Sequence, residues 1–243
     1  MNFYKEAYSS LLWNIGFYLS KYDREIRKKE FLDTSSISLL PDLNLEYIPW
    51  TDASIDPSSI RAILNEIIIH KKYRVIEFGS GISTLFISKI IEDVGEGHVT
   101  SIEHDESWLR VVKGYLEKME ISSSTYSLEH VKLTEYKRRE DIHEWYNVDR
   151  IGRVTKDEKY ELALVDGPVG SKSEKYNIER YPAVPNIIEN MSEDFVIFLD
   201  DTRRPGEKYI KKNWCKKYNL TSKKIASMSA LRPKSNNSNF HIL

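Results

Sequence analysis

The feature that most constrains the fold is an alternation of short apolar segments with spacers long enough to be helices. The strand candidates, of which the third is the weakest, are 74–78, 98–103, 127–133, 161–166 and 195–200. The helical patterns between and after them cover 82–94, 105–119, 178–191 and 205–218. Apolar, β-branched strands joined by helix-length connections are typical of parallel sheets that are buried on both faces. We therefore predict an α/β fold with a doubly wound, mostly parallel sheet.

The C-terminal segment predicts a departure from this parallel arrangement. Residues 223–228 and 239–243 are two further strand candidates, and the turn-rich segment 232–238 joins them. Strands this near to each other form a hairpin, so we expect a C-terminal antiparallel strand at one edge of the sheet.

The N-terminal segment predicts a helical extension. Apolar residues recur at spacings of three and four within 3–22, which indicates an amphipathic helix, and a basic stretch follows at 24–29. This helix packs on the domain or on a second subunit, as in a homo-oligomer, or lies at a membrane surface. Residues 31–55 show no clear period, and we expect an irregular connector there. The predicted organisation is an extension and connector over 1–47 and one domain over 48–243.

Composition narrows the class of protein. Lys and Arg total 36 and Asp and Glu total 37, so the net charge of −1 gives no general attraction for nucleic acid. The single cysteine, Cys215, excludes an internal disulfide, which fits a cytoplasmic location. No apolar run approaches the ~18 residues of a membrane span, and the first residues do not have the order of a signal peptide.

Carboxylates follow four of the predicted strands, and this is the strongest functional signal in the chain. The relevant residues are Glu77, Glu103, Asp166 and the pair Asp200 and Asp201. Ligands of open parallel sheets bind outside the carboxyl ends of the strands. We therefore expect one site that brings these side chains together.

A glycine turn after the first strand indicates a nucleotide-like ligand. Gly79 and Gly81 let the backbone turn tightly and approach a ligand closely, and Glu103 follows Gly81 by 22 residues. At that distance a carboxylate can accept hydrogen bonds from both ribose hydroxyls. Both a dinucleotide and S-adenosylmethionine fit this arrangement.

Two residues favour S-adenosylmethionine over NAD. Thr84 stands where the dinucleotide fingerprint has its third glycine. Glu77 would repel a pyrophosphate, but its charge complements an ammonium or sulfonium group. An NAD-dependent oxidoreductase remains the first alternative. A non-catalytic, cofactor-binding subunit of a glycan-assembly complex is the second.

The segments VIEFGSGIST, VTSIEHD, YELALVDGP and FVIFLDDTRRPGE resemble, in this order, the class I S-adenosylmethionine-dependent methyltransferases. The resemblance runs from about Ile48 to the C-terminus and implies a Rossmann-like sheet of seven strands. It implies that the cofactor contacts Glu77, Gly79, Ser80, Gly81, Glu103, His104 and Asp166. The adenine contact after the third strand stays open between Thr134 and Glu135.

Within this family, the acidic residues resemble the magnesium site of catechol O-methyltransferase. The resemblance implies that Asp166, Asp200 and Asp201 are catalytic and bind Mg²⁺, with Asp201 in place of the family's Asn. Carboxylate oxygens suit a hard divalent cation, which would activate an acceptor hydroxyl. A third negative charge fits equally well with no metal and one Asp as a general base.

Residues around the strand ends suggest the acceptor. The candidates for acceptor contact are Trp50, Tyr146, Arg180, Tyr181 and Arg203. Aromatic rings and amides suit a sugar, and several cations suit a phosphate or carboxylate. The Arg-Tyr-Pro triplet and the DDTRRPGE block are similar to a bacterial group of methyltransferases associated with surface-polysaccharide gene clusters. We therefore expect O-methylation of a small molecule or a saccharide.

Overall fold

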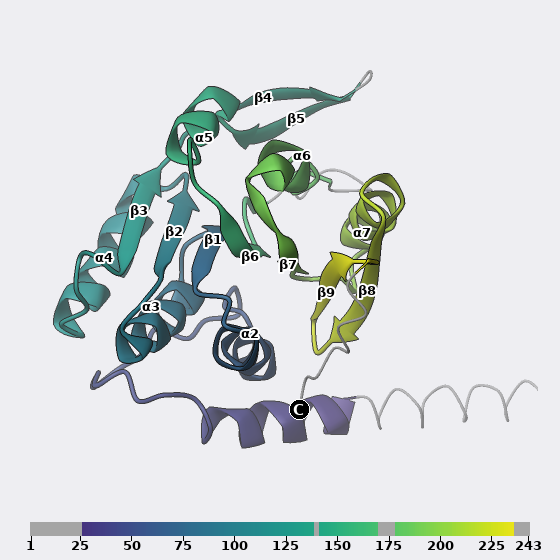
Figure 1. Ribbon diagram of the computed structural model, residues 1–243. Helices are drawn as coiled ribbons and strands as arrows, with labels where there is room; N and C mark the ends of the chain where they lie inside the picture. The colour runs from purple at the N-terminus through teal and green to yellow at the C-terminus, as the bar shows by residue number, and fades with distance from the viewer. Residues whose placement is uncertain (1–25, 139–140, 170–177, 236–243) are drawn as a thin grey trace, which may run out of the picture.

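The protein is built around one twisted sheet with helices on both faces, as the computed structural model in Figure 1 shows. The model describes residues 26–138, 141–169 and 178–235. The seven strands lie in the order β3-β2-β1-β6-β7-β9-β8, and β9 is antiparallel to both of its neighbours. Their bounds are β1 Arg74–Phe78, β2 His98–Glu103, β3 Tyr126–His130, β6 Tyr160–Val165, β7 Met191–Leu199, β8 Leu220–Ile225 and β9 Met228–Pro233. The predicted fold class is confirmed.

Each face of the sheet has its own layer of helices. One layer comprises α2 Pro57–His70, α3 Ile82–Val94 and α4 Glu106–Lys118. The other comprises α5 Val148–Val154, α6 Ala183–Ile187 and α7 Pro205–Lys217. A short 3-10 helix, η1 Ile188–Asn190, links α6 to β7.

The side chains of the central strands point alternately to the two faces of the sheet, which explains why each face has its own layer of helices. In β1, Val75 belongs to the core under α2 and α3, whereas Ile76 and Phe78 belong to the core on the opposite face. Successive side chains of a strand point to opposite faces, so a strand buried on both sides is apolar at nearly every position. Glu77 is the exception in β1, because it lies on the α3 side and is fully buried.

The helix starts follow local signals. Asp56 caps α2 by accepting a hydrogen bond from the Ser59 backbone N–H at 2.9 Å, and Pro57 occupies the first turn. Asp105 caps α4 in the same way through the N–H groups of Ser107 and Trp108.

The C-terminal hairpin forms earlier in the chain than predicted. Strand β8 ends at Ile225 and β9 begins at Met228, so a two-residue turn interrupts the segment 223–228 that we expected to be one strand. Ala226 occupies this turn with a φ of 50°. The usual turn residues are Gly, Asn and Asp, and neither Ala226 nor Ser227 is one of them, so the sequence carries no signal for the turn. The candidate strand 239–243 lies outside the described residues.

Two connecting segments are more regular than the sequence suggests. The expected irregular connector from residue 31 is wrong at its start, because a helix covers 26–37. The polar segment after β3 forms a separate antiparallel pair, β4 Leu133–Arg138 with β5 Asp141–Tyr146. The amphipathic helix predicted over 3–22 falls in a part of the chain that the structure does not describe. None of the described helices is both long and apolar enough to cross a membrane.

Candidate functional site

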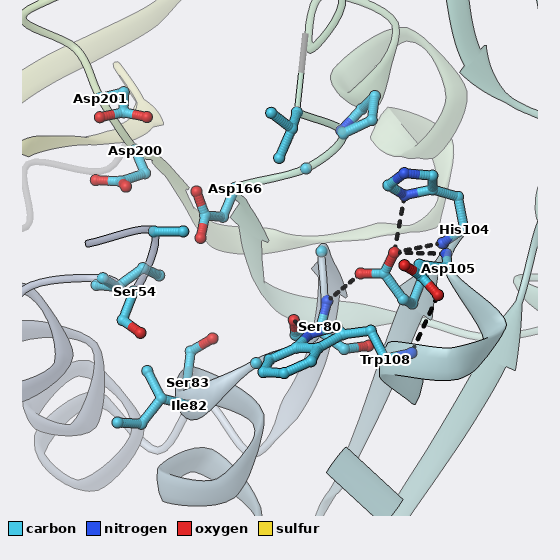
Figure 2. Close-up of a pocket in the computed structure, with 18 of the residues that line it drawn as sticks. Ser54, Ser80, Ile82, Ser83, His104, Asp105, Trp108, Asp166, Asp200 and Asp201 are labelled. Atoms are coloured by element: carbon cyan, nitrogen blue, oxygen red, sulfur yellow. Dashed lines mark hydrogen bonds and ion pairs between the residues drawn. The ribbon is translucent and has the colours of Figure 1, made fainter. Parts of the chain in front are cut away.

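A cavity of ≈ 420 Å³ lies at the carboxyl ends of the parallel strands. The chain leaves β1 toward β2 on one side and later returns to β6 on the other, so the cavity is at the switch point of the sheet. Its walls are the β1–α3 turn, the end of β2, the residues after β6 and β7, and the loop 51–55. Figure 2 shows Ser80, His104 and Trp108 on one side of the cavity and the three aspartates on the other.

The turn after β1 requires glycine at its first position. Gly79 has a φ of +94°, a conformation that L side chains rarely adopt, and a Cβ there would lie 2.8 Å from the Gly167 backbone nitrogen. Gly81, in contrast, has no atom within 4 Å of where its Cβ would lie, and it lines the cavity. The first glycine therefore brings two loops together, and the second leaves space at the cavity wall.

Glu77 lies beneath this turn and does not line the cavity. Its carboxylate accepts hydrogen bonds from the hydroxyls of Ser83, Thr84 at 2.5 Å and Ser101 at 2.7 Å. Burial raises the pKa of Glu77 to about 7, although the three hydroxyl donors oppose the shift. These hydrogen bonds connect the first turn of α3 with β1 and β2. They also hold a titratable carboxyl beneath the glycine turn.

Glu103 presents its carboxylate to the opposite end of the turn. One oxygen accepts a hydrogen bond from the Ser80 N–H at 3.0 Å, and the other contacts His104 Nδ1 at 2.8 Å. Burial works to raise the pKa of Glu103, but the His104 side chain and backbone N–H donors outweigh it and lower the pKa. The pKa of His104 is raised, chiefly by its hydrogen bond to Glu103. Glu103 is therefore an anionic acceptor at the cavity wall.

Trp108 was not expected at the site. Its indole N–H donates a hydrogen bond to the Ser80 carbonyl at 2.8 Å, and the residue lines the cavity. The β4–β5 pair bears Thr134 and Glu135, the two candidates for an adenine contact, and neither lines the cavity.

Three carboxylates meet on the other side of the cavity. One oxygen from each of Asp166, Asp200 and Asp201 lies within 4.8 Å of the others. Burial raises the pKa of Asp166 to about 8 and also raises that of Asp200, to which the neighbouring Asp201 contributes. Asp201 has a φ of 58°, which Asp tolerates better than most residues, and this turn directs it back toward Asp166.

Arg180 joins this acidic cluster from a different segment. Its guanidinium lies 3.1 Å from an Asp166 oxygen and 3.5 Å from an Asp201 oxygen, and its side chain is only 6% exposed. Arg204 adds a second cation at 2.8 Å from Asp201. The charge of the aspartates is therefore partly balanced by two guanidinium groups.

The structure brings some of the predicted acceptor residues to the cavity and not others. Tyr146 and Arg180 line it. Trp50 instead packs with its ring 6.1 Å from that of Phe86. Tyr181 packs against the core under α7, and Arg203 lines a different cavity. Residues that the sequence did not single out also line the site, among them Ser54, Ile55 and Trp108.

No protein-family model matches the sequence. No curated protein matches it. Solved structures do match, but at sequence identities so low that they establish the fold alone.

Methyltransferases are among the matching structures. A Staphylococcus aureus protein described as a caffeoyl-CoA O-methyltransferase is 12% identical with a TM-score of 0.58, over 85% of this chain and 99% of its own. An O-methyltransferase from Bacillus cereus in complex with S-adenosylhomocysteine is 11% identical with a TM-score of 0.56, over 87% and 91%. The methyltransferase PaMTH1 of Podospora anserina, also bound to S-adenosylhomocysteine, is 12% identical with a TM-score of 0.56, over 88% and 96%. The chain therefore has the Rossmann-like fold of the class I methyltransferases.

Proposed function

We propose that this protein is an S-adenosylmethionine-dependent O-methyltransferase. One observation carries the proposal: a single cavity has the glycine turn and Glu103 on one side and the aspartate cluster on the other. This arrangement lies on a fold shared with structures that hold S-adenosylhomocysteine.

The residues on the β1 and β2 side fit the cofactor. Glu103 offers carboxylate oxygens to the ribose hydroxyls, and the space beside Gly81 lets a ligand approach the backbone. Gly79 and Ser80 would hold the methionine end, and His104 would contact the adenine. Glu77, with a pKa of about 7, places a partly ionised carboxyl beneath the turn. S-adenosylmethionine, when bound, supplies a methyl group from its sulfonium.

The aspartate cluster fits an acceptor hydroxyl that must lose its proton. Asp166, with a pKa raised to about 8, accepts this proton when it is ionised, so it acts as a base at mildly alkaline pH. Arg180 holds the Asp166 and Asp201 carboxylates in place and balances charge as the proton moves.

The same three aspartates fit a divalent cation. Their oxygens converge within 4.8 Å, and hard cations such as Mg²⁺ prefer oxygen ligands. Asp166, Asp200 and Asp201 would hold the ion, which would lower the pKa of a coordinated hydroxyl. Arg180 contacts Asp166 and Asp201, and Arg204 contacts Asp201, so these guanidinium groups compete with a metal ion for the two carboxylates. A test must therefore distinguish activation of the hydroxyl by a metal from proton transfer to Asp166 without one.

The acceptor that we propose is a hydroxyl of a saccharide or a related small molecule. The loop 51–55 supports this choice, because it adds the polar side chains Thr51, Asp52 and Ser54 to the cavity wall near the aspartates. Hydroxyl and carboxylate groups of this kind recognise sugar hydroxyls by hydrogen bonding.

Calorimetry with S-adenosylhomocysteine tests the proposal. We expect saturable binding to the wild-type protein and about a tenfold or greater loss of affinity in Glu103→Gln, since hydrogen bonds to a charged group are replaced. Glu106→Gln is the matched control, because Glu106 is exposed and forms a surface ion pair with Arg110. Binding of NAD in place of S-adenosylhomocysteine would support the oxidoreductase alternative and refute the proposal.

A Mn²⁺ titration followed by electron paramagnetic resonance tests the metal site. We expect stoichiometric binding that is lost in Asp200→Asn and unchanged in Asp93→Asn, which alters an exposed residue of α3. Wild-type protein that binds S-adenosylhomocysteine but no Mn²⁺ would refute the metal and leave Asp166 as the base.

A further inference from the structure

A second cavity, of ≈ 480 Å³, lies beside the first and is strongly basic. It opens between the helix at 26–37, α2, the residues after β7 and the strand β8. Among the described residues, six cations line it: Lys28, Lys29, Arg61, Arg203, Lys223 and Lys224.

The concentration of positive charge in this cavity is unusual for the chain. The protein as a whole has a net charge of −1, yet none of the described residues that line the cavity is acidic. The cations come from four separate segments that the tertiary structure brings together, and Asp33 and Asp56 balance part of the charge through Lys29. An anion bound among them would relieve the remaining repulsion between them.

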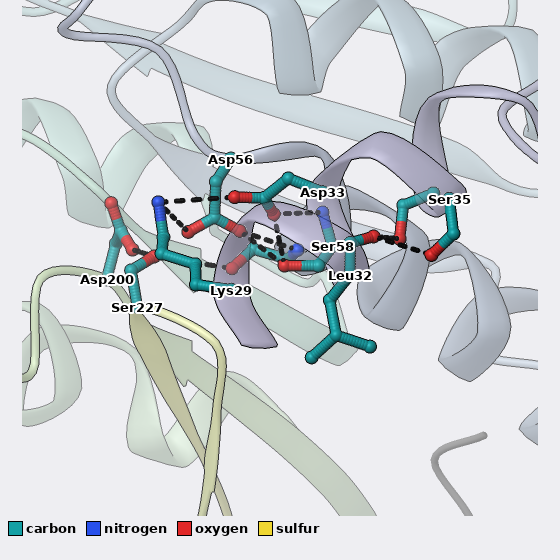
Figure 3. Close-up of polar contacts among 10 residues, drawn as sticks. Lys29, Leu32, Asp33, Ser35, Asp56, Ser58, Asp200 and Ser227 are labelled. Carbon is teal, nitrogen blue, oxygen red and sulfur yellow. Dashed lines mark hydrogen bonds and ion pairs between the residues drawn. The ribbon is translucent and has the colours of Figure 1, made fainter. Parts of the chain in front are cut away.

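A short chain of polar side chains connects the two cavities. Lys29 of the basic cavity lies 3.8 Å from Asp56, and Ser227 donates a hydrogen bond to Asp200 at 2.9 Å (Figure 3). Ser227 also forms a side-chain hydrogen bond with Asp56. A continuous polar path therefore runs from Lys29 to an aspartate of the acidic cluster.

Adjacent arginines mark the same boundary. Arg204 lines the first cavity and contacts Asp201, whereas Arg203 lines the basic cavity. A ligand bound by Arg203 would therefore lie next to Arg204, which contacts the aspartate cluster through Asp201.

We propose that the basic cavity binds a phosphate group of the methyl acceptor. The proposal rests on the function proposed above, because the acceptor is the molecule whose hydroxyl must reach the aspartates. Arg61 and Arg203 offer planar forks of N–H donors that match phosphate oxygens, and the lysines add point charges. The acceptor is therefore a phosphorylated or diphosphate-linked compound.

The shape of the surface favours a phosphate group over a membrane. Four of the cations are exposed, but together the six surround a concavity whose wall includes the buried Ser58 and the half-buried Arg61, whereas a lipid surface contacts a flat or convex face. A concave site surrounds a single anionic group from several sides.

Calorimetry with inorganic pyrophosphate tests the inference, and it is independent of S-adenosylhomocysteine. We expect saturable binding that weakens by about tenfold or more in the double variant Arg203→Gln, Lys224→Gln. The matched control is Lys212→Gln, Lys216→Gln, which removes the same net charge from α7 outside the cavity and should change the affinity less than about twofold. Affinity for S-adenosylhomocysteine should be unchanged in both double variants.

The outcomes separate the two proposals. No saturable binding of pyrophosphate, or an equal loss in the control, would overturn the basic cavity as a phosphate site while the methyltransferase proposal stands. Binding of pyrophosphate without any binding of S-adenosylhomocysteine would overturn the acceptor assignment together with the proposed function. Sedimentation with phosphatidylglycerol vesicles but not phosphatidylcholine vesicles, without pyrophosphate binding, would show a membrane contact instead.

Discussion

Replacing Glu77 by glutamine should change how the stability of the fold depends on pH. Glu77 is fully buried, and only the hydroxyls of Ser83, Thr84 and Ser101 compensate for its lost hydration. Burial raises its pKa to about 7, from 4.5 in the unfolded chain. The folded protein therefore holds this proton more tightly than the unfolded chain does.

The sign and size of the effect follow from proton linkage. The stability that comes from the protonated form is fully present below pH 4.5 and is lost as the pH rises through about 7. Each pKa unit corresponds to about 1.4 kcal/mol, so a difference of this size amounts to about 3 kcal/mol at alkaline pH. Glutamine imitates the protonated acid and cannot ionise, and the neighbouring hydroxyls can rotate to accept from its amide.

Urea unfolding at about pH 5 and about pH 8 measures this difference. We expect the wild type to lose about 2.5 kcal/mol more than Glu77→Gln between these two values, since other titrating groups are common to both proteins. Glu96→Gln, which changes an exposed residue, should lose as much unfolding free energy between these pH values as the wild type. A wild type and a Glu77→Gln variant with parallel pH profiles would refute the idea that burial destabilises the Glu77 carboxylate.

Two further predictions concern the backbone at the site and the core. Gly79→Ala should destabilise the protein by about 2–5 kcal/mol, because it adds a clash with Gly167 to the cost of a positive φ. Gly95→Ala, with a positive φ but no neighbour within 4 Å, should cost only about 1–2 kcal/mol, and equal costs in thermal unfolding would contradict the clash. Arg232→Met should cost about 3–5 kcal/mol in urea unfolding, because it leaves the buried Glu66 without its guanidinium partner. Adding Glu66→Leu should restore most of that loss, and a double variant no more stable than Arg232→Met would contradict this account.

Several elements of the fold could be predicted from the sequence because their signals are local. The helix predicted over 82–94 is α3 Ile82–Val94, and the helix predicted from residue 205 is α7 Pro205–Lys217. Periodicity and helix-starting residues are properties of a few consecutive residues. The carboxylates at the strand ends were found for the same reason, because a parallel sheet brings those ends to one edge.

Other features could not be predicted from the sequence, because they depend on contacts between distant segments. The turn at Ala226 is fixed by the pairing of β9 with β7 and β8 and not by its residue types. Glu77 was predicted to face the ligand, yet the pleat of β1 and the position of α3 put it beneath the glycine turn.

The two arginines after the aspartates show this division most clearly. The sequence by itself determined that Arg203 and Arg204 follow a strand end rich in carboxylates. Only the tertiary structure decided that Arg204 contacts Asp201 in the acidic cavity while Arg203 joins lysines from the helix at 26–37 and from β8 in another. The physical reason is that neighbouring side chains diverge from a tight turn, so the cavity that each one enters depends on the segments packed on either side.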